Sequence, residues 1–151
     1  MKTKRKSGKT TTAARKRYEG FSDAERSAMQ ARVEEMKVDK AADGETALLA
    51  KIAEMKEPDL SMAKRLHALV KATDPTLTPT TYYGMPAYAR NGKSVFWFKP
   101  AGKFKSRYAT LEFGDIATLD DGTMWPVSWA LAKMTSADEA KIKALIKKAA
   151  G

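Results

Sequence analysis

The stretch that decides the fold is residues 83–98, YGMPAYARNGKSVFWF. Its Asn91-Gly92 pair predicts a tight β-hairpin, because both residues tolerate positive φ angles. Residues 94–98 follow as a strand with apolar side chains on both faces, which predicts a central position in a sheet. Gly84-Met85-Pro86 predicts a turn before the hairpin.

Further strand patterns flank this segment. Residues 80–83 and 88–90 are β-prone, and residues 107–113 alternate between apolar and polar side chains. Residues 100–103 predict a turn. Residues 125–131 alternate again, and Pro126 confines that strand to a sheet edge. An antiparallel β-meander is therefore expected.

Helical patterns surround the strands. Ser22 and Glu25 have capping-box spacing and precede a helix with the apolar stripe Met29, Val33 and Met36, which either packs lightly on the domain or receives a partner. Residues 45–56 predict one helix, and a second helix follows Pro58, with Asp59 or Ser61 as its cap, and ends at Asp74-Pro75, so the two form a helical hairpin. A second capping box at residues 136–139 starts the last helix. The fold class expected is α+β, a two-layer sandwich with an N-terminal helical hairpin, a β-meander and a C-terminal helix.

Charged residues are unevenly distributed along the chain of 151 residues, which has a formal net charge of +10. Residues 1–17 hold eight basic residues and no acidic one, whereas the remainder holds 20 basic and 18 acidic residues. We therefore predict a disordered basic tail at 1–20, an appended helix at 21–42 and the α+β domain at 43–151. No apolar run approaches the ~20 residues that span a bilayer, so a cytoplasmic protein without membrane contact is expected.

The hexapeptide at residues 83–88, YGMPAY, together with Asn91-Gly92-Lys93 and the segment 120–126, resembles the YdhG-like family. The resemblance covers about residues 45–150. The family is largely a domain of unknown function, and some members are described as frataxin-like iron chaperones. The resemblance implies a two-layer α+β fold and a binding role with iron as the ligand.

Acidic residues are the candidate ligands for such a cation, because iron accepts carboxylate oxygens. A group without intervening bases consists of Glu112, Asp115, Asp120 and Asp121. The competing interpretation is that Asp120-Asp121-Gly122 is an ordinary turn sequence.

Residues 75–111 contain no acid and interleave cations with aromatic rings. This pattern favours a small anionic ligand or nucleic acid. The candidate ligand pocket consists of Tyr83, Met85, Tyr88 and Trp97, which could instead fix a turn and fill the core. The candidate nucleic-acid contacts are Lys4, Arg5, Lys6, Arg15, Lys16, Arg17, Lys103, Lys105 and Arg107, the first six offering non-specific contact through the tail.

Catalytic chemistry finds little support. The chain has no Cys and one His, which excludes disulfides, thiol nucleophiles and multi-histidine metal sites. His67 flanks an apolar helix face and is expected to be partly buried and hydrogen-bonded. The sequence predicts a small binding domain, with iron as the ligand by resemblance and nucleic acid as the alternative.

Overall fold

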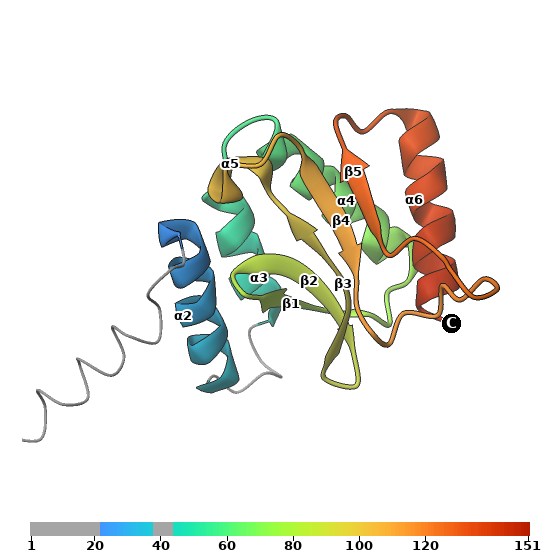
Figure 1. Cartoon of the computed structure of the whole chain (residues 1–151), viewed down its shortest axis with the longest axis horizontal. Helices are drawn as coiled ribbons and strands as arrows, with labels where there is room; N and C mark the ends of the chain where they lie inside the picture. Colours follow the sequence, from blue (N-terminus) through green and yellow to red (C-terminus); the bar gives the residue numbers. More distant parts are fainter. Residues whose placement is uncertain (1–21, 38–43) are drawn as a thin grey trace, which may run out of the picture.

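The computed structural model describes residues 22–37 and 44–151 and shows an α+β fold (Figure 1). The predicted basic tail at residues 1–20 lies outside the described residues. Among those described, no helix has the length and apolar character needed to cross a bilayer. The elements are α2 (Asp23–Lys37), α3 (Gly44–Ala53), α4 (Asp59–Thr73), β1 (Thr78–Tyr82), β2 (Met85–Arg90), β3 (Lys93–Lys99), α5 (Ala101–Phe104), β4 (Ala109–Phe113), β5 (Ser128–Leu131) and α6 (Ser136–Ala149).

The five strands form one antiparallel sheet in the order β1-β2-β3-β4-β5, so the predicted meander is confirmed. The central strand is β3, as its apolar residues on both faces indicate. Asn91 and Gly92 connect β2 to β3 with φ angles of 53° and 77°, the positive values that a tight hairpin of this kind requires.

A bulge interrupts the pairing of β2 with β3. Tyr88 pairs with Phe96 and Ala89 pairs with Ser94, so Val95 has no partner in the register. The extra residue places Ser94 and Trp97 on the same face of the sheet, although three positions separate them.

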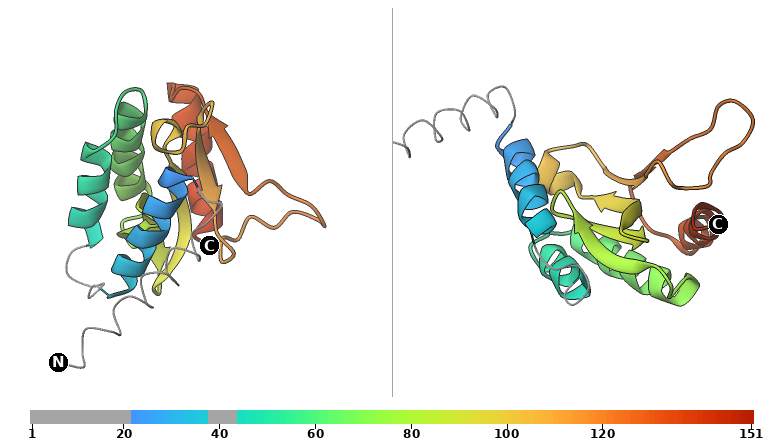
Figure 2. Two further views of the ribbon diagram at one scale, coloured as in Figure 1. Left: turned by 60° about the vertical axis from the view of Figure 1, so that its left-hand side comes forward. Right: turned by 90° about the horizontal axis from the view of Figure 1, so that it is seen from below.

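Helices α3, α4 and α6 cover one face of the sheet, called here the core face (Figure 2). Phe96, Phe98 and Leu111 belong to one buried cluster with Leu66 of α4 and Ile146 of α6. Fully burying a side chain of this size stabilises the fold by roughly 1.5–3 kcal/mol. The opposite face, called here the open face, is covered in part by α2, which contacts β1 and α5.

Helix α2 packs on the domain, which is the first of the two alternatives that its sequence offers. The Ser22 hydroxyl accepts a hydrogen bond from the Glu25 N–H (3.1 Å), as the predicted capping box requires. The predicted apolar stripe is wrong at Val33, which is 38% exposed, whereas Ala28 is buried. Small side chains face inward because α2 passes close to the turn at Gly84.

Several predicted boundaries differ from the structure. Met85 and Pro86, predicted in a turn, begin β2, and the helix predicted over residues 45–56 ends at Ala53. Helix α6 is capped by Thr135 rather than Ser136, because the Thr135 hydroxyl accepts from the Asp138 N–H (3.2 Å) and the Asp138 carboxylate accepts from the Thr135 N–H (2.9 Å). Residues 101–104 form the short helix α5 instead of a turn. Strand β5 begins at Ser128, after Pro126, whose ring nitrogen cannot donate to a ladder.

Candidate functional site

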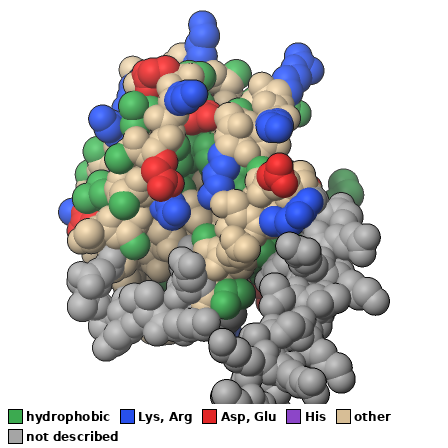
Figure 3. Space-filling view, turned by 90° about the vertical axis from the view of Figure 1, so that its left-hand side faces the viewer, with side chains coloured by type: hydrophobic (Ala, Val, Ile, Leu, Met, Phe, Trp, Pro, Cys, Tyr) green, Lys and Arg blue, Asp and Glu red, His purple; other side chains and the backbone are tan. Residues whose placement is uncertain are grey.

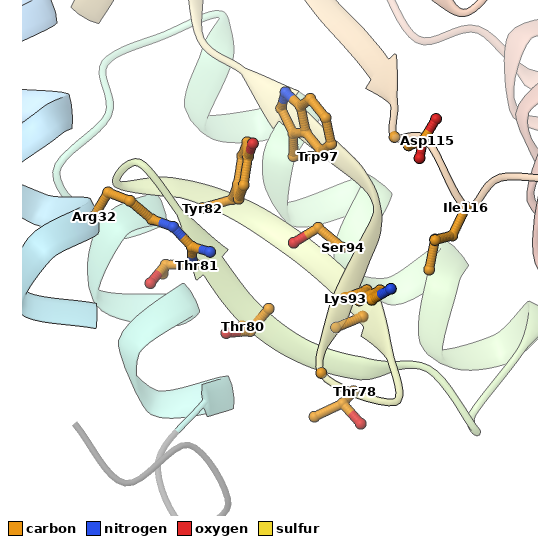
Figure 4. A pocket seen from close by; sticks show the side chains of 13 residues that line it. Arg32, Thr78, Thr80, Thr81, Tyr82, Lys93, Ser94, Trp97, Asp115 and Ile116 are labelled. Atoms are coloured by element: carbon orange, nitrogen blue, oxygen red, sulfur yellow. The ribbon is translucent and has the colours of Figure 1, made fainter. Parts of the chain in front are cut away.

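A pocket of about 550 Å³ lies on the open face, between α2, the strands β1 to β3 and the segment that follows β4 (Figure 4). Its position follows from strand alternation, because every second residue of each strand points away from the core face. Thr80 of β1, Ala87 of β2 and Trp97 of β3 lie side by side in the register. The side chains that line the pocket on this face therefore come from consecutive strands of the meander.

Two aromatic rings and a guanidinium form one wall of the pocket. The Tyr82 and Trp97 rings lie with centroids 4.5 Å apart and planes inclined by 35°. The Arg32 guanidinium, which reaches over from α2, is 5.1 Å from the centroid of the Tyr82 ring and 5.8 Å from that of Tyr83. A cation at this distance from a ring face is attracted by the ring quadrupole. Tyr82 is therefore in contact with both Arg32 and Trp97, and Trp97 is the ring of this wall on which a planar group could stack beside a positive charge.

A hydrogen bond fixes the orientation of the Trp97 indole. Its Nε1–H donates to the Glu112 carboxylate (3.0 Å), which also accepts from the Thr110 hydroxyl (3.1 Å). The register places Trp97 and Glu112 directly opposite each other on β3 and β4. A held ring loses less conformational entropy when a ligand stacks on it.

Hydroxyl groups and a second cation line the remainder of the pocket. Figure 4 shows Thr80 and Ser94 beside the cavity and Arg32 directed toward it from α2. Lys93 and Asp115 stand at the far end, opposite α2. With Arg32, the lining carries two cations against one carboxylate, which favours an anion over a cation.

The predicted ligand-pocket residues divide between the two faces. Trp97 lines the pocket, and Tyr83 and Met85 line an adjoining hollow of about 200 Å³ between α2 and the sheet. Tyr88 was predicted with them and does not belong to the pocket. It pairs with Phe96 on the core face, where its ring stacks on that of Phe96 at a centroid distance of 5.0 Å.

The predicted metal ligands, Glu112, Asp115, Asp120 and Asp121, do not form one cluster. Among residues 22–37 and 44–151, no three His, Cys, Asp or Glu side chains lie close enough together to hold a metal ion. Glu112 is engaged by Trp97 and Thr110, and Asp115 lines the pocket. Asp120 and Asp121 are exposed at the turn before Gly122, whose φ is 67°. These two acids therefore lie at the surface, just before a turn at residues 122–123.

The predicted nucleic-acid contacts that the structure describes lie at α5 and the turn after it. The ammonium groups of Lys99 and Lys103 lie 5.1 and 5.6 Å from the Phe104 ring centroid, and the Arg107 guanidinium lies 5.9 Å from that of Tyr108. Lys105 is exposed in the left-handed conformation that ends α5. The six tail residues of the same prediction lie outside the described residues.

His67 is buried and hydrogen-bonded, as predicted. Its Nδ1 is 3.0 Å from the Tyr88 hydroxyl and its Nε2 is 3.0 Å from the Glu45 carboxylate. Hydrogen bonds from Lys71 and then His67 lower the pKa of Glu45, so this carboxylate accepts and the Nε2–H donates. The network joins α3, α4 and β2 on the core face, and Tyr88 is fully buried there. Its role is therefore structural.

A second cavity, of about 460 Å³, lies where α2, α3 and α5 approach each other. Asp59 at its border is buried, and one carboxylate oxygen accepts from the Gly102 N–H (2.9 Å). This bond holds the start of α5 against the start of α4. Gly84 also lines this cavity with φ 77°, and a Cβ there would lie 2.6 Å from the Lys103 ammonium. The positive φ angle favours glycine at this turn of the YGMPAY segment, whereas the Lys103 ammonium is the end of a flexible side chain that can move aside.

Comparisons with family models, curated proteins and solved structures find no match to this chain. The site therefore rests on its own geometry. Sequence patterns identified Trp97, and Tyr82 only as one of the aromatic rings of residues 75–111, but missed Arg32, Thr80 and Ser94. Alternation along β1 places Tyr82 and Thr80 on one face, whereas Arg32 comes from a separate helix and Ser94 is on that face only through the bulge.

Proposed function

We propose that this protein is a binding domain and that the pocket on the open face holds a ligand with a planar ring and an anionic group. The observation that carries the proposal is that the Trp97 ring, which lines the pocket, lies 4.5 Å from the Tyr82 ring, over which the Arg32 guanidinium is placed. Ligand pockets of roughly 300–1,000 Å³ with aromatic walls and a few polar groups are the usual sites for small molecules. A volume of about 550 Å³ falls in this range.

The polar groups define the chemistry of the ligand. Arg32 offers a planar set of donors that suits a carboxylate or a phosphate. Thr80 and Ser94 supply hydroxyls that donate or accept, which suits the edge of a heterocycle or a sugar. Binding rather than catalysis is proposed because the pocket lining combines these hydroxyls with no His or Cys.

The iron hypothesis rests on the resemblance to the YdhG-like family. The described residues contribute no group of three ligating side chains to it, and the pocket carries more cationic than anionic groups. A planar anion therefore has more support in the geometry of this chain than a ferrous ion does.

The test is a titration of the full-length protein with adenosine monophosphate, adenosine and inorganic phosphate, followed by ¹⁵N NMR of the indole N–H signals. The chain has three tryptophans, so three signals are resolved. We expect adenosine monophosphate to shift the Trp97 signal, because its ring stacks on the indole that donates to Glu112. Adenosine and phosphate are each expected to bind with at least about tenfold lower affinity than adenosine monophosphate, since adenosine lacks the anionic group and phosphate lacks the planar ring.

Two variants and one control complete the test. Trp97→Ala and Arg32→Gln are expected to weaken binding about tenfold, because one removes the stacking surface and the other the cation. Arg65→Gln is the matched control, because Arg65 lies on α4 and does not line the pocket. Its guanidinium pairs instead with the Glu139 carboxylate, at a distance of 2.6 Å. Loss of affinity in the control alone, or equal affinity in all proteins, would show that the pocket is not the site.

A further inference from the structure

We infer that the pocket takes one base of a single-stranded nucleic acid, with the rest of the strand following β3 toward α5. This inference rests on the proposed function and names its ligand class. The observation behind it is that the pocket does not end at Trp97. Aromatic rings and cations continue from it along one direction of the open face, and their order matches the alternation of bases and phosphates in a strand.

The continuation starts on β3 itself. Lys99 follows Trp97 by two residues and is on the same face, opposite Thr110 of β4. Two residues of a strand span about 6.6 Å. The Lys99 ammonium then lies over the Phe104 ring of α5 at 5.1 Å, so a cation and a second ring stand directly beyond the pocket.

The turn after α5 adds further cations. Lys105 and Arg107 are exposed, and Arg107 lies over Tyr108, which is 43% exposed. In the part of the chain that the structure describes, Lys99, Lys105 and Arg107 form no ion pair with a carboxylate. Figure 3 shows the side that holds α2, α3 and α5, where Lys and Arg side chains stand at the surface among Asp and Glu side chains. This set of cations is therefore presented to solvent.

The acids beside this track do not cancel its charge. Glu25 and Glu112 line the hollow between α2 and Phe104, and Asp115 stands at the far end of the pocket. Glu112 is held by Trp97 and Thr110, and Glu25 accepts from the Ser22 hydroxyl. Glu54 and Asp59 line the second cavity together with Lys103. The cations of the track itself are therefore Lys93, Lys99, Lys105 and Arg107, four against the three acids Glu25, Glu112 and Asp115.

Single-stranded nucleic acid fits this track better than a duplex does. A base can enter the pocket and stack on the Trp97 ring only if it is unpaired, because paired bases present their edges and not their faces. The phosphates that follow then meet Lys99 and the cations around α5. A free mononucleotide would engage the pocket alone and leave the α5 cations unused.

The experiment compares the affinities of the full chain for three ligands. Fluorescence anisotropy measures binding of fluorescein-labelled (dT)₁₀, and competition against that probe measures a ten-base-pair duplex and thymidine monophosphate. Indole NMR reports whether each ligand shifts the Trp97 signal. We expect (dT)₁₀ to bind at least tenfold more tightly than either of the other two. Trp97→Ala is expected to weaken (dT)₁₀ by about 5- to 150-fold, the range for the loss of one stacked base. The triple variant Lys99→Glu/Lys105→Glu/Arg107→Glu is expected to weaken (dT)₁₀ but not thymidine monophosphate. It should also reduce the slope of log K against log salt by about 2, since three phosphate contacts contribute about 0.7 each.

The matched control is Lys143→Glu/Lys147→Glu/Lys148→Glu, which makes the same change in net charge on exposed positions of α6, in the layer over the core face. It is expected to retain the affinity and the salt slope of the unmodified chain. The inference is overturned if (dT)₁₀ binds no more tightly than thymidine monophosphate, if the duplex binds equally well, or if the control loses as much affinity as the α5 variant. In each of these cases the proposed function stands as long as thymidine monophosphate still shifts the Trp97 signal. It fails separately if no planar anion does so.

Discussion

The Tyr88 hydroxyl is expected to contribute measurably to stability, and its contribution should disappear at alkaline pH. Tyr88 is fully buried and donates to Nδ1 of His67, whose Nε2–H donates in turn to Glu45. Tyr88→Phe keeps the ring stacked on Phe96 and leaves the His67 nitrogen without its donor. An unsatisfied buried acceptor costs about 1–3 kcal/mol. The variant should therefore unfold with a free energy lower by about that amount at pH 7.

The pH dependence follows from the direction of the pKa shift. Burial, and secondly the charge of Glu45, raise the pKa of Tyr88 well above its ordinary value of 10.0. The folded protein thus keeps the phenol proton at pH values where the unfolded chain releases it. The contribution is complete below pH 10 and is lost as the pH rises above it, by about 1.4 kcal/mol per pH unit. The difference between the unmodified chain and Tyr88→Phe should therefore shrink by about 1.4 kcal/mol between pH 9 and pH 11.

The assay is urea unfolding followed by far-ultraviolet circular dichroism at pH 7, 9 and 11, for both proteins and for Tyr108→Phe. Tyr108 is 43% exposed, so removing its hydroxyl is the matched control and should change the free energy of unfolding little at any of these pH values. Ionisation of the other tyrosines and lysines cancels in the difference between two proteins. A difference that stays constant from pH 7 to pH 11 would refute the reasoning, because Tyr88 would then ionise equally in both states.

Two further predictions concern the helix cap and the acid of the pocket. Thr135→Ala removes the hydroxyl that accepts from the Asp138 N–H, and it should lower stability by about 1 kcal/mol in a thermal or urea melt, whereas Thr123→Ala in the exposed turn should be neutral. Glu112→Gln keeps an oxygen for the Trp97 indole and removes one negative charge. Calorimetric titration of this variant should show about 2- to 5-fold tighter binding of adenosine monophosphate, corresponding to ~0.5–1 kcal/mol for one partly exposed charge. If Glu112 were instead an iron ligand, the same variant would lose affinity for ferrous iron.

The sheet and its order were predictable because local chemistry determines them. Asn91 and Gly92 adopt the positive φ angles that their side chains permit, and this turn places β2 beside β3. The continuous apolar pattern of residues 94–98 places β3 at the centre of the sheet. Each of these inferences needs only neighbouring residues. The distribution of buried and exposed positions along β4 follows in the same way from strict alternation.

The pocket was only partly predictable, because two of its causes are not local. The bulge at Val95 places Ser94 on the same face of the sheet as Trp97. The amino-acid pattern of residues 94–98 does not indicate that one residue of β3 has no partner on β2. Arg32 reaches the pocket only because α2 packs with Ala28 inward, whereas periodicity indicated a face centred on Met29 and Val33. Tyr88 was assigned to the pocket by its place in the YGMPAY segment, and its register with Phe96 puts it on the other side of the sheet.

The two faces of the sheet separate stability from binding, and this separation makes the proposals testable. On the core face, Tyr88, Phe96 and Leu111 are fully buried with the side chains of three helices, so substitutions there change the free energy of unfolding. On the open face, Trp97 is only partly buried and sits one residue along β3 from Phe96. Truncating Trp97 removes less buried contact than truncating its neighbour does, and it leaves the core cluster intact. A loss of ligand binding in Trp97→Ala without a comparable loss of stability therefore points to the pocket itself, whereas the same loss in a Phe96 variant would not.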